Sequence, residues 1–210
     1  MKACCDSKSS ELEVIREKQG SVLKIVLSIN LVMFFVEAIS GITAHSTSLL
    51  ADSLDMLGDA FVYGFSLYAI GKTPRWGAST ALLKGSIMLL FGIGVLFEAT
   101  RRYLSPETPV AATMGLVGGL AMTANVCCAI LLMRHRNDDL NMRSTWLCTR
   151  NDVLANIGVI IAAAAVAFTQ SRLPDLFVGV AISTLVLKSA YSVLRDSIST
   201  LRQSPTLLRR

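Results

Sequence analysis

The chain has 210 residues, of which 52% are hydrophobic and 17% are charged. A soluble domain usually carries about a quarter charged residues, whereas here the apolar residues collect in blocks of roughly 20, the length that crosses a bilayer. The formal net charge of +5 does not indicate nucleic acid, because most Lys and Arg residues lie between these blocks, where membrane topology explains them. We therefore predict an all-α protein that lies in the lipid bilayer. We do not expect it to bind nucleic acid.

The apolar blocks predict a six-helix transmembrane bundle. The six spans cover residues 22–41, 49–71, 78–103, 110–133, 145–168 and 174–198. Pro174 opens the last span, where the missing N–H of proline does no harm. The expected organisation is an N-terminal cytoplasmic tail (1–20), a transmembrane domain (21–198) and a short cytoplasmic C-terminal tail (199–210).

Basic residues near the ends of the spans predict the orientation. Fourteen Lys and Arg residues lie in or next to the two tails and the loops after the second and fourth spans. The loops at the opposite ends of the spans have only Arg101, Arg102 and Arg172 in or near them. Both termini are therefore expected in the cytoplasm, as an even number of spans requires. We predict a multi-pass protein of a bacterial inner membrane, with no cleaved signal peptide in the polar N-terminal segment.

The cysteines do not indicate a disulfide scaffold. There are five, and they include the adjacent pairs Cys4–Cys5 and Cys127–Cys128. An odd number without a spaced framework is not typical of a disulfide-stapled fold. Cys127 and Cys128 are expected to pack in the core, and the two cysteines of the tail make an incomplete metal site.

Three carboxylates in the second span are the strongest functional signal. Asp55 and Asp59 are separated by one helical turn, and Asp52 falls within about 20° of Asp59 around the helix axis. An ionised group in a span costs several kcal/mol unless it faces a partner or a wet cavity. Helix packing alone is the weaker interpretation, because three acids on one stripe more naturally share a cation. Asp52 is expected to support the site rather than to bind the ion.

The fifth span offers a second pair of ligands. Cys148 and Asp152 are also one turn apart, and Asn151 lies beside them. Three carboxylates and one thiolate suit Zn²⁺, and the sulfur favours softer ions such as Cd²⁺ over Mg²⁺. The alternative is that Cys148 only packs as a small apolar residue and that Asn151 completes the ligand shell.

The motifs of these two spans resemble those of the cation diffusion facilitator family. The stretch from Ser48 to Asp59 is similar to the second helix of that family, with Asp55 and Asp59 in its ligand pair. The stretch from Asp152 to Gly158 is similar to the fifth helix, which places Asp152 at the second ligand position and Cys148 at the first. The start of the sixth span, from Pro174 to Gly179, also resembles the family.

The resemblance implies a homodimer that exchanges cytoplasmic metal for external protons. Cys148 departs from the usual His or Asp, and this bears on metal preference. The chain also ends without the cytoplasmic C-terminal domain typical of the family, so we expect a short member. Small residues are expected to permit close approach between subunits; they are Ala81, Gly85, Gly92, Gly94, Gly179, Ser183 and Ala190.

Together these features predict a carrier rather than an enzyme. The expected activity is proton-coupled efflux of a divalent transition metal, most simply Zn²⁺ and next Cd²⁺, through Asp55, Asp59, Cys148 and Asp152, with no bound cofactor. Fe²⁺, Mn²⁺, Co²⁺ and Ni²⁺ remain open as cargo. An exporter of organic cations is disfavoured because no aromatic residue lies between Leu49 and Ala60. An intramembrane enzyme is disfavoured because no nucleophile–base pair or two-histidine helix is present.

Overall fold

The structure, a computed structural model, describes residues 2–68, 74–105, 107–134 and 140–203. Side chains are described for residues 20–64, 67, 79, 82–105, 107–134, 149, 152–199 and 201. Within these ranges the chain forms six helices and no strand, as predicted. The helices are α1 (Lys2–Thr43), α2 (Thr47–Tyr68), α3 (Pro74–Leu104), α4 (Ala111–Met133), α5 (Leu140–Thr169) and α6 (Leu173–Gln203).

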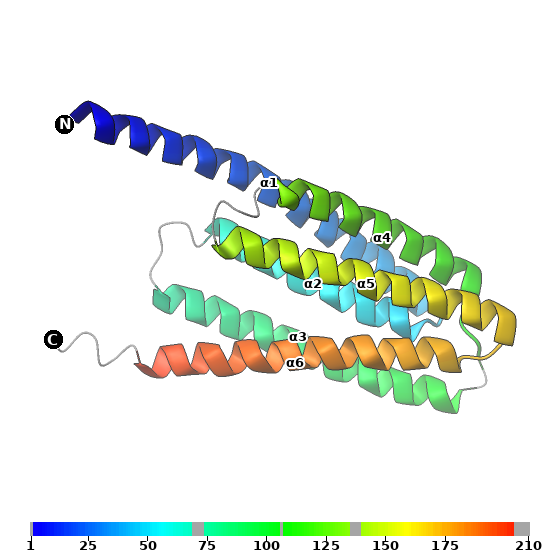
Figure 1. The fold of residues 1–210 in the computed structure, drawn as a ribbon. Coiled ribbons are helices and arrows are strands. Elements are labelled where there is room, and N and C mark those ends of the chain that lie inside the picture. Colours follow the sequence, from blue (N-terminus) through cyan, green and yellow to red (C-terminus); the bar gives the residue numbers. More distant parts are fainter. Residues whose placement is uncertain (1, 69–73, 106, 135–139, 204–210) are drawn as a thin grey trace.

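Helix α2 is the centre of the bundle. It contacts each of the other five helices, whereas α3 packs chiefly against α6 and α4 chiefly against α5. Figure 1 shows the α3–α6 pair along one side of the molecule and α1, α2, α4 and α5 along the other. The other helices therefore surround α2, the helix that carries Asp52, Asp55 and Asp59.

The ends of the chain lie at the same end of the bundle. In Figure 1 the start of α1 and the end of α6 both point to the left, and the α1–α2, α3–α4 and α5–α6 connections lie at the opposite end. This arrangement agrees with an even number of crossings. The side of the membrane on which the termini lie stays a prediction from the basic residues.

Five of the six helices have spans long and apolar enough to cross a membrane among the described residues. These spans are Gly20–Thr43, Leu82–Leu104, Ala111–Met133, Asp152–Thr169 and Leu173–Ser199. The expected sixth, α2, is not among them, since Asp52, Asp55 and Asp59 interrupt its apolar sequence. Its position explains how these residues are tolerated: the other helices shield α2 from lipid.

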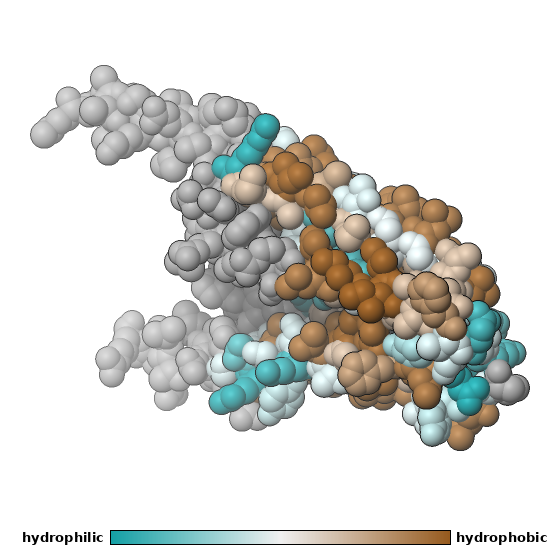
Figure 2. All heavy atoms as spheres, turned by 45° about the vertical axis from the view of Figure 1, so that its right-hand side comes forward, coloured by the Kyte–Doolittle hydropathy of each residue, from teal (hydrophilic) through white to brown (hydrophobic). Residues whose placement is uncertain are grey.

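The outward faces of the helices are apolar. Phe97, Phe168 and Phe177 are 72%, 89% and 78% exposed, and Figure 2 shows hydrophobic residues over much of the visible described surface. Exposed area of this kind suits lipid contact in a chain with several apolar spans. The chain is thus a multi-pass membrane protein, as predicted.

The small residues expected at a subunit interface are largely used within the chain. A Cβ atom on Gly85 would lie 2.9 Å from Leu194 Cγ, and one on Gly92 would lie 2.7 Å from Leu187 Cδ2, so both glycines admit leucines of α6. Ser183 and Ala190 are fully buried, and Gly179 lies against α2. Most of these positions therefore permit close approach within the chain, and their predicted role in dimer contact stays a prediction.

A buried carboxylate joins the start of α6 to the start of α2. Asp175 is 1% exposed and accepts hydrogen bonds from the backbone N–H groups of Thr47 and Ser48, at 2.7 and 3.1 Å. The hydroxyls of Ser46 and Ser48 also donate to Asp175 Oδ1, at 2.7 and 2.6 Å. An acidic group satisfies the free N–H groups of a helix start and complements its dipole. The end of the bundle opposite the termini is held together in this way.

Candidate metal site

Helices α2 and α5 lie antiparallel, and polar side chains join them at three successive levels. Tyr63 meets Thr149 at one level, and Asp52 meets Asn156 about three turns away along α2 and about two turns away along α5. Asp152 lies between these levels on α5 and meets the acidic pair of α2. The one-turn spacing seen in the sequence thus becomes a face-to-face arrangement of two helices.

The middle level brings three predicted ligands together. The carboxyl group of Asp152 lies close to those of Asp55 and Asp59. Asp59 is 8% exposed, whereas Asp55 and Asp152 are partly exposed. Carboxyl groups that converge in this way can bind protons or a cation, because a cation needs deprotonated ligands.

The other predicted ligands lie outside the described side chains. These are Cys148 and the alternative ligand Asn151, whose backbones belong to α5. The described residues contain no group of three or more His, Cys, Asp and Glu side chains arranged to hold a metal ion. The four-ligand site therefore stays a prediction.

Tyr63 positions Asp59 and is a residue that sequence reasoning missed. The Tyr63 hydroxyl donates to Asp59 Oδ2 over 2.5 Å and lies 2.7 Å from Thr149 Oγ1. Since the tyrosine proton is engaged by Asp59, the threonine hydroxyl is the donor to Tyr63. Both residues are buried. The available signal was spacing, because Tyr63 continues the stripe of Asp55 and Asp59 by one more turn.

Asp52 belongs to a separate buried network on the side of the site away from the termini. The side-chain amide of Asn156 donates to Asp52, and Asn125 of α4 donates to Asn156 Oδ1 over 2.9 Å. Glu37 of α1 lies against Asp52. All four side chains are at most 1% exposed. The network links four helices beside the acidic cluster, which is the place of a supporting residue.

Two charged residues of α3 differ in their surroundings. Lys84 interacts electrostatically with Asp55 and Asp59, so a cationic group faces the acidic cluster. Glu98 lies near the C-terminal end of α3. It binds the guanidinium groups of Arg101 and Arg102, with shortest N–O distances of 2.7 and 2.8 Å. The pairing follows from the one-turn spacing of these residues at the end of α3.

Comparison with known proteins identifies the family. The model of the cation efflux transmembrane domain matches residues 23–202. The chain is 28% identical to a cadmium, cobalt and zinc/H(+)-K(+) antiporter of Bacillus subtilis, over 86% of this chain and 64% of that protein. The antiporter of the same name from Bacillus velezensis is 30% identical, with 88% of this chain and 64% of that protein covered.

Zinc transporters are also among the relatives. The zinc transporter ZitB of Escherichia coli is 28% identical, over 79% of this chain and 57% of that protein. The chain thus spans less than two thirds of the length of these relatives. The match of the family model extends from α1 to α6 and includes both helices of the candidate site. The chain belongs to the cation efflux family, as the motifs of its second and fifth helices predict.

Proposed function

We propose that this chain carries Zn²⁺ out of the cytoplasm in exchange for protons, with Cd²⁺ as a second substrate. The observation that carries the proposal is the contact of Asp152 with both Asp55 and Asp59 across two helices. Oxygen ligands from α2 and α5 would bind one ion together, and Cys148 would supply a fourth ligand. The names of the relatives, which include cadmium, cobalt and zinc, support this class of substrate.

The chemistry of the acidic cluster accounts for the exchange. When no metal is bound, the carboxyl groups share protons with each other. A divalent ion needs deprotonated ligands, so its binding releases these protons and reprotonation expels the ion. Lys84 adds a positive charge near Asp55 and Asp59, which favours release once the cluster is protonated. No resident cofactor is needed for such a cycle.

The test is transport into proteoliposomes with a pH gradient. We expect uptake of Zn²⁺ by the wild-type chain, and its loss in Asp59→Ala and Asp152→Ala, because each variant removes a ligand from a different helix. Glu107→Ala is the matched control, since this carboxylate is 60% exposed and lies in the α3–α4 connection. Normal transport by either site variant would contradict the two-helix site.

The same assay addresses the alternative substrates. Co²⁺, Ni²⁺, Fe²⁺ and Mn²⁺ should be compared as cargo with Zn²⁺ and Cd²⁺, since affinity order alone does not set transport selectivity. Cobalt has specific support from the names of the Bacillus relatives. An exporter of organic cations would instead accumulate an amine and ignore all six metals.

A further inference from the structure

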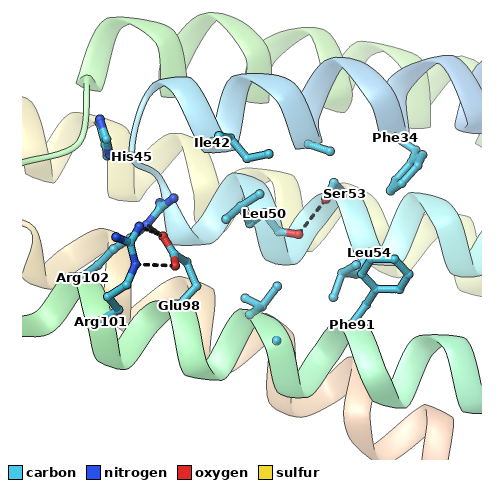
Figure 3. A pocket seen from close by; sticks show the side chains of 13 residues that line it. Phe34, Ile42, His45, Leu50, Ser53, Leu54, Phe91, Glu98, Arg101 and Arg102 are labelled. Carbon is cyan, nitrogen blue, oxygen red and sulfur yellow. Dashed lines mark hydrogen bonds and ion pairs between the residues drawn. The ribbon is translucent and has the colours of Figure 1, made fainter.

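A groove lies between α1, α2 and α3, and its lining includes none of Asp55, Asp59 and Asp152. Its volume is about 510 Å³, which is within the usual size range of ligand pockets. The lining is mostly aliphatic and aromatic, and includes Phe34, Ile42, Leu50, Leu54, Phe91 and Val95. Figure 3 shows Phe34 and Phe91 near one end and the charged side chains near the other. The groove therefore has a polar end and an apolar body.

The polar end carries an excess of positive charge within the lining. One carboxylate, that of Glu98, binds both Arg101 and Arg102. Side-chain exposure is 65% for Arg101 and only 9% for Arg102. Arg102 also donates to Gly41 O over 3.3 Å, but its Nη1 atom is buried without a hydrogen-bond partner among the described residues.

Other polar groups nearby do not supply the missing acceptor. His45 lines the groove, and its Nδ1 atom lies 3.1 Å from Glu107 Oε2. Glu107 is 60% exposed and does not line the groove. A buried guanidinium N–H group without an acceptor is costly. An anionic oxygen at this end would satisfy Arg102 and neutralise the excess charge.

The dimensions of the groove match one leaflet of a bilayer. At a rise of 1.5 Å per residue, Phe91 lies about 15 Å along α3 from Arg101, and Phe34 lies about 12 Å along α1 from Ile42. Half of the hydrocarbon thickness of a bilayer is about 15 Å. Both α1 and α3 contain candidate membrane spans that end near the charged residues. The polar end is thus at headgroup level and the aromatic end near the midplane.

We propose that this groove binds an anionic phospholipid, whose phosphate contacts Arg101 and Arg102 and whose acyl chain lies between α1 and α3. The lipid would belong to the leaflet at the end of the bundle opposite the termini. The proposal concerns a site separate from the metal ligands and does not depend on which ion is carried. It gives the buried Nη1 atom of Arg102 a partner and fills an apolar groove that is open to the membrane.

Gly94 provides a way to block the groove without disturbing the chain. It lines the groove, and a Cβ atom added there meets nothing within 4 Å. Gly119 on α4 is equally open but does not line the groove, so it is the matched control. The pair Gly94→Phe and Gly119→Phe therefore separates occupation of the groove from the general effect of a new aromatic side chain.

The experiment measures lipid binding to the purified, delipidated full chain by native mass spectrometry. The probes are phosphatidylglycerol and phosphatidylcholine with identical acyl chains. We expect wild type to bind one phosphatidylglycerol tightly, and at least about tenfold more tightly than phosphatidylcholine. Both lipids carry the phosphate, but the choline cation of phosphatidylcholine offsets the attraction to the excess positive charge at this end of the groove, and a difference of about 1.4 kcal/mol is tenfold. Gly94→Phe should lose this binding and Gly119→Phe should keep it.

Arg101→Gln tests the headgroup contact with the more exposed arginine, which leaves the buried Arg102 pair in place. It removes the excess positive charge at this end of the groove, so it should reduce the preference for phosphatidylglycerol over phosphatidylcholine. Equal binding of both lipids by wild type, or wild-type binding by Gly94→Phe, would overturn the proposal. So would disulfide formation between copies of Gly94→Cys in the membrane, since a second copy of the chain would then occupy the groove.

Discussion

Tyr63 shows how a single hydroxyl can position a ligand of the candidate site. Its donor bond to Asp59 and its acceptor bond from Thr149 tie α2 to α5 one turn from the acidic cluster. Tyr63 is 1% exposed, so its ring is also part of the packing between α1, α2 and α4. The hydroxyl and the ring can be separated experimentally because phenylalanine keeps the ring.

We predict that Tyr63→Phe raises the Zn²⁺ concentration needed for half-maximal transport by about tenfold. The loss of a hydrogen bond to a charged group is worth about 1.5 kcal/mol or more, and 1.4 kcal/mol is a factor of ten. Zinc titration of transport in proteoliposomes measures this shift. Thr149→Val is the control, because it removes the other bond of Tyr63 and leaves Asp59 its donor. A larger defect in Thr149→Val would assign the effect to helix packing.

We also predict that Cys148 sets which metal is carried. Cys148→Asp should lose the preference for Cd²⁺ and tolerate harder ions, because an all-oxygen site replaces a soft thiolate. Cys148→Ser should weaken transport of every ion, since an alcohol is a poor anionic ligand. Transport of Zn²⁺, Cd²⁺ and Mn²⁺ by both variants decides the matter. If Cys148→Ser keeps the Zn²⁺ to Cd²⁺ ratio and Asn151→Ala changes it, Asn151 is the ligand.

At the scale of helices, α6 approaches the start of α2 closely at Gly179. A Cβ atom on Gly179 would lie 2.7 Å from Thr47 Cγ2, 2.8 Å from Thr47 C and 2.9 Å from Ser48 N. Two of these atoms belong to the backbone, which cannot turn aside as a flexible side chain can. The glycine therefore permits the hydrogen bonds that Asp175 accepts from α2.

We predict that Gly179→Ala destabilises the protein by about 1–3 kcal/mol, the usual cost of overpacking a tight contact. Thermal unfolding in a mild detergent should show a lower midpoint than wild type. Gly119→Ala is the control, because its Cβ atom meets nothing within 4 Å and the substitution has the same chemistry. An unchanged midpoint for Gly179→Ala would show that α2 and α6 can separate at little cost.

At the scale of the whole molecule, both termini lie at the same end of the bundle. The excess of Lys and Arg near that end predicts that it faces the cytoplasm, and this can be tested. We predict that the cysteines of the N-terminal segment, Cys4 and Cys5, react with a membrane-impermeant maleimide only after the cells are permeabilised. Thr108→Cys, in the exposed α3–α4 connection, should react in intact cells. The reason is that Lys and Arg near the span ends favour the cytoplasm. Labelling of the wild-type chain in intact cells would place the termini outside.

The sequence predicts where the helices lie along the chain better than it predicts which helices pack against each other. Each of the six expected spans overlaps one of the helices α1 to α6, although α1 begins well before its span, because apolar blocks of membrane length are local features of the sequence. The sequence offers Gly85 and Gly92 as places of close approach between subunits, and the structure shows that both pack against α6 of the same chain. A small residue shows that something approaches closely, but the sequence does not say which helix does so.

The sequence by itself determined that two one-turn motifs, Asp55–Asp59 and Cys148–Asp152, belong to different membrane helices of a cation efflux protein. Helical periodicity suffices for this, because it places each pair on one face. Only the tertiary structure decided that Asp152 meets both acids of α2, that Tyr63 supports Asp59, and that a groove ends at Arg102. These contacts join residues far apart in the chain, and packing of whole helices, rather than local spacing, brings them together.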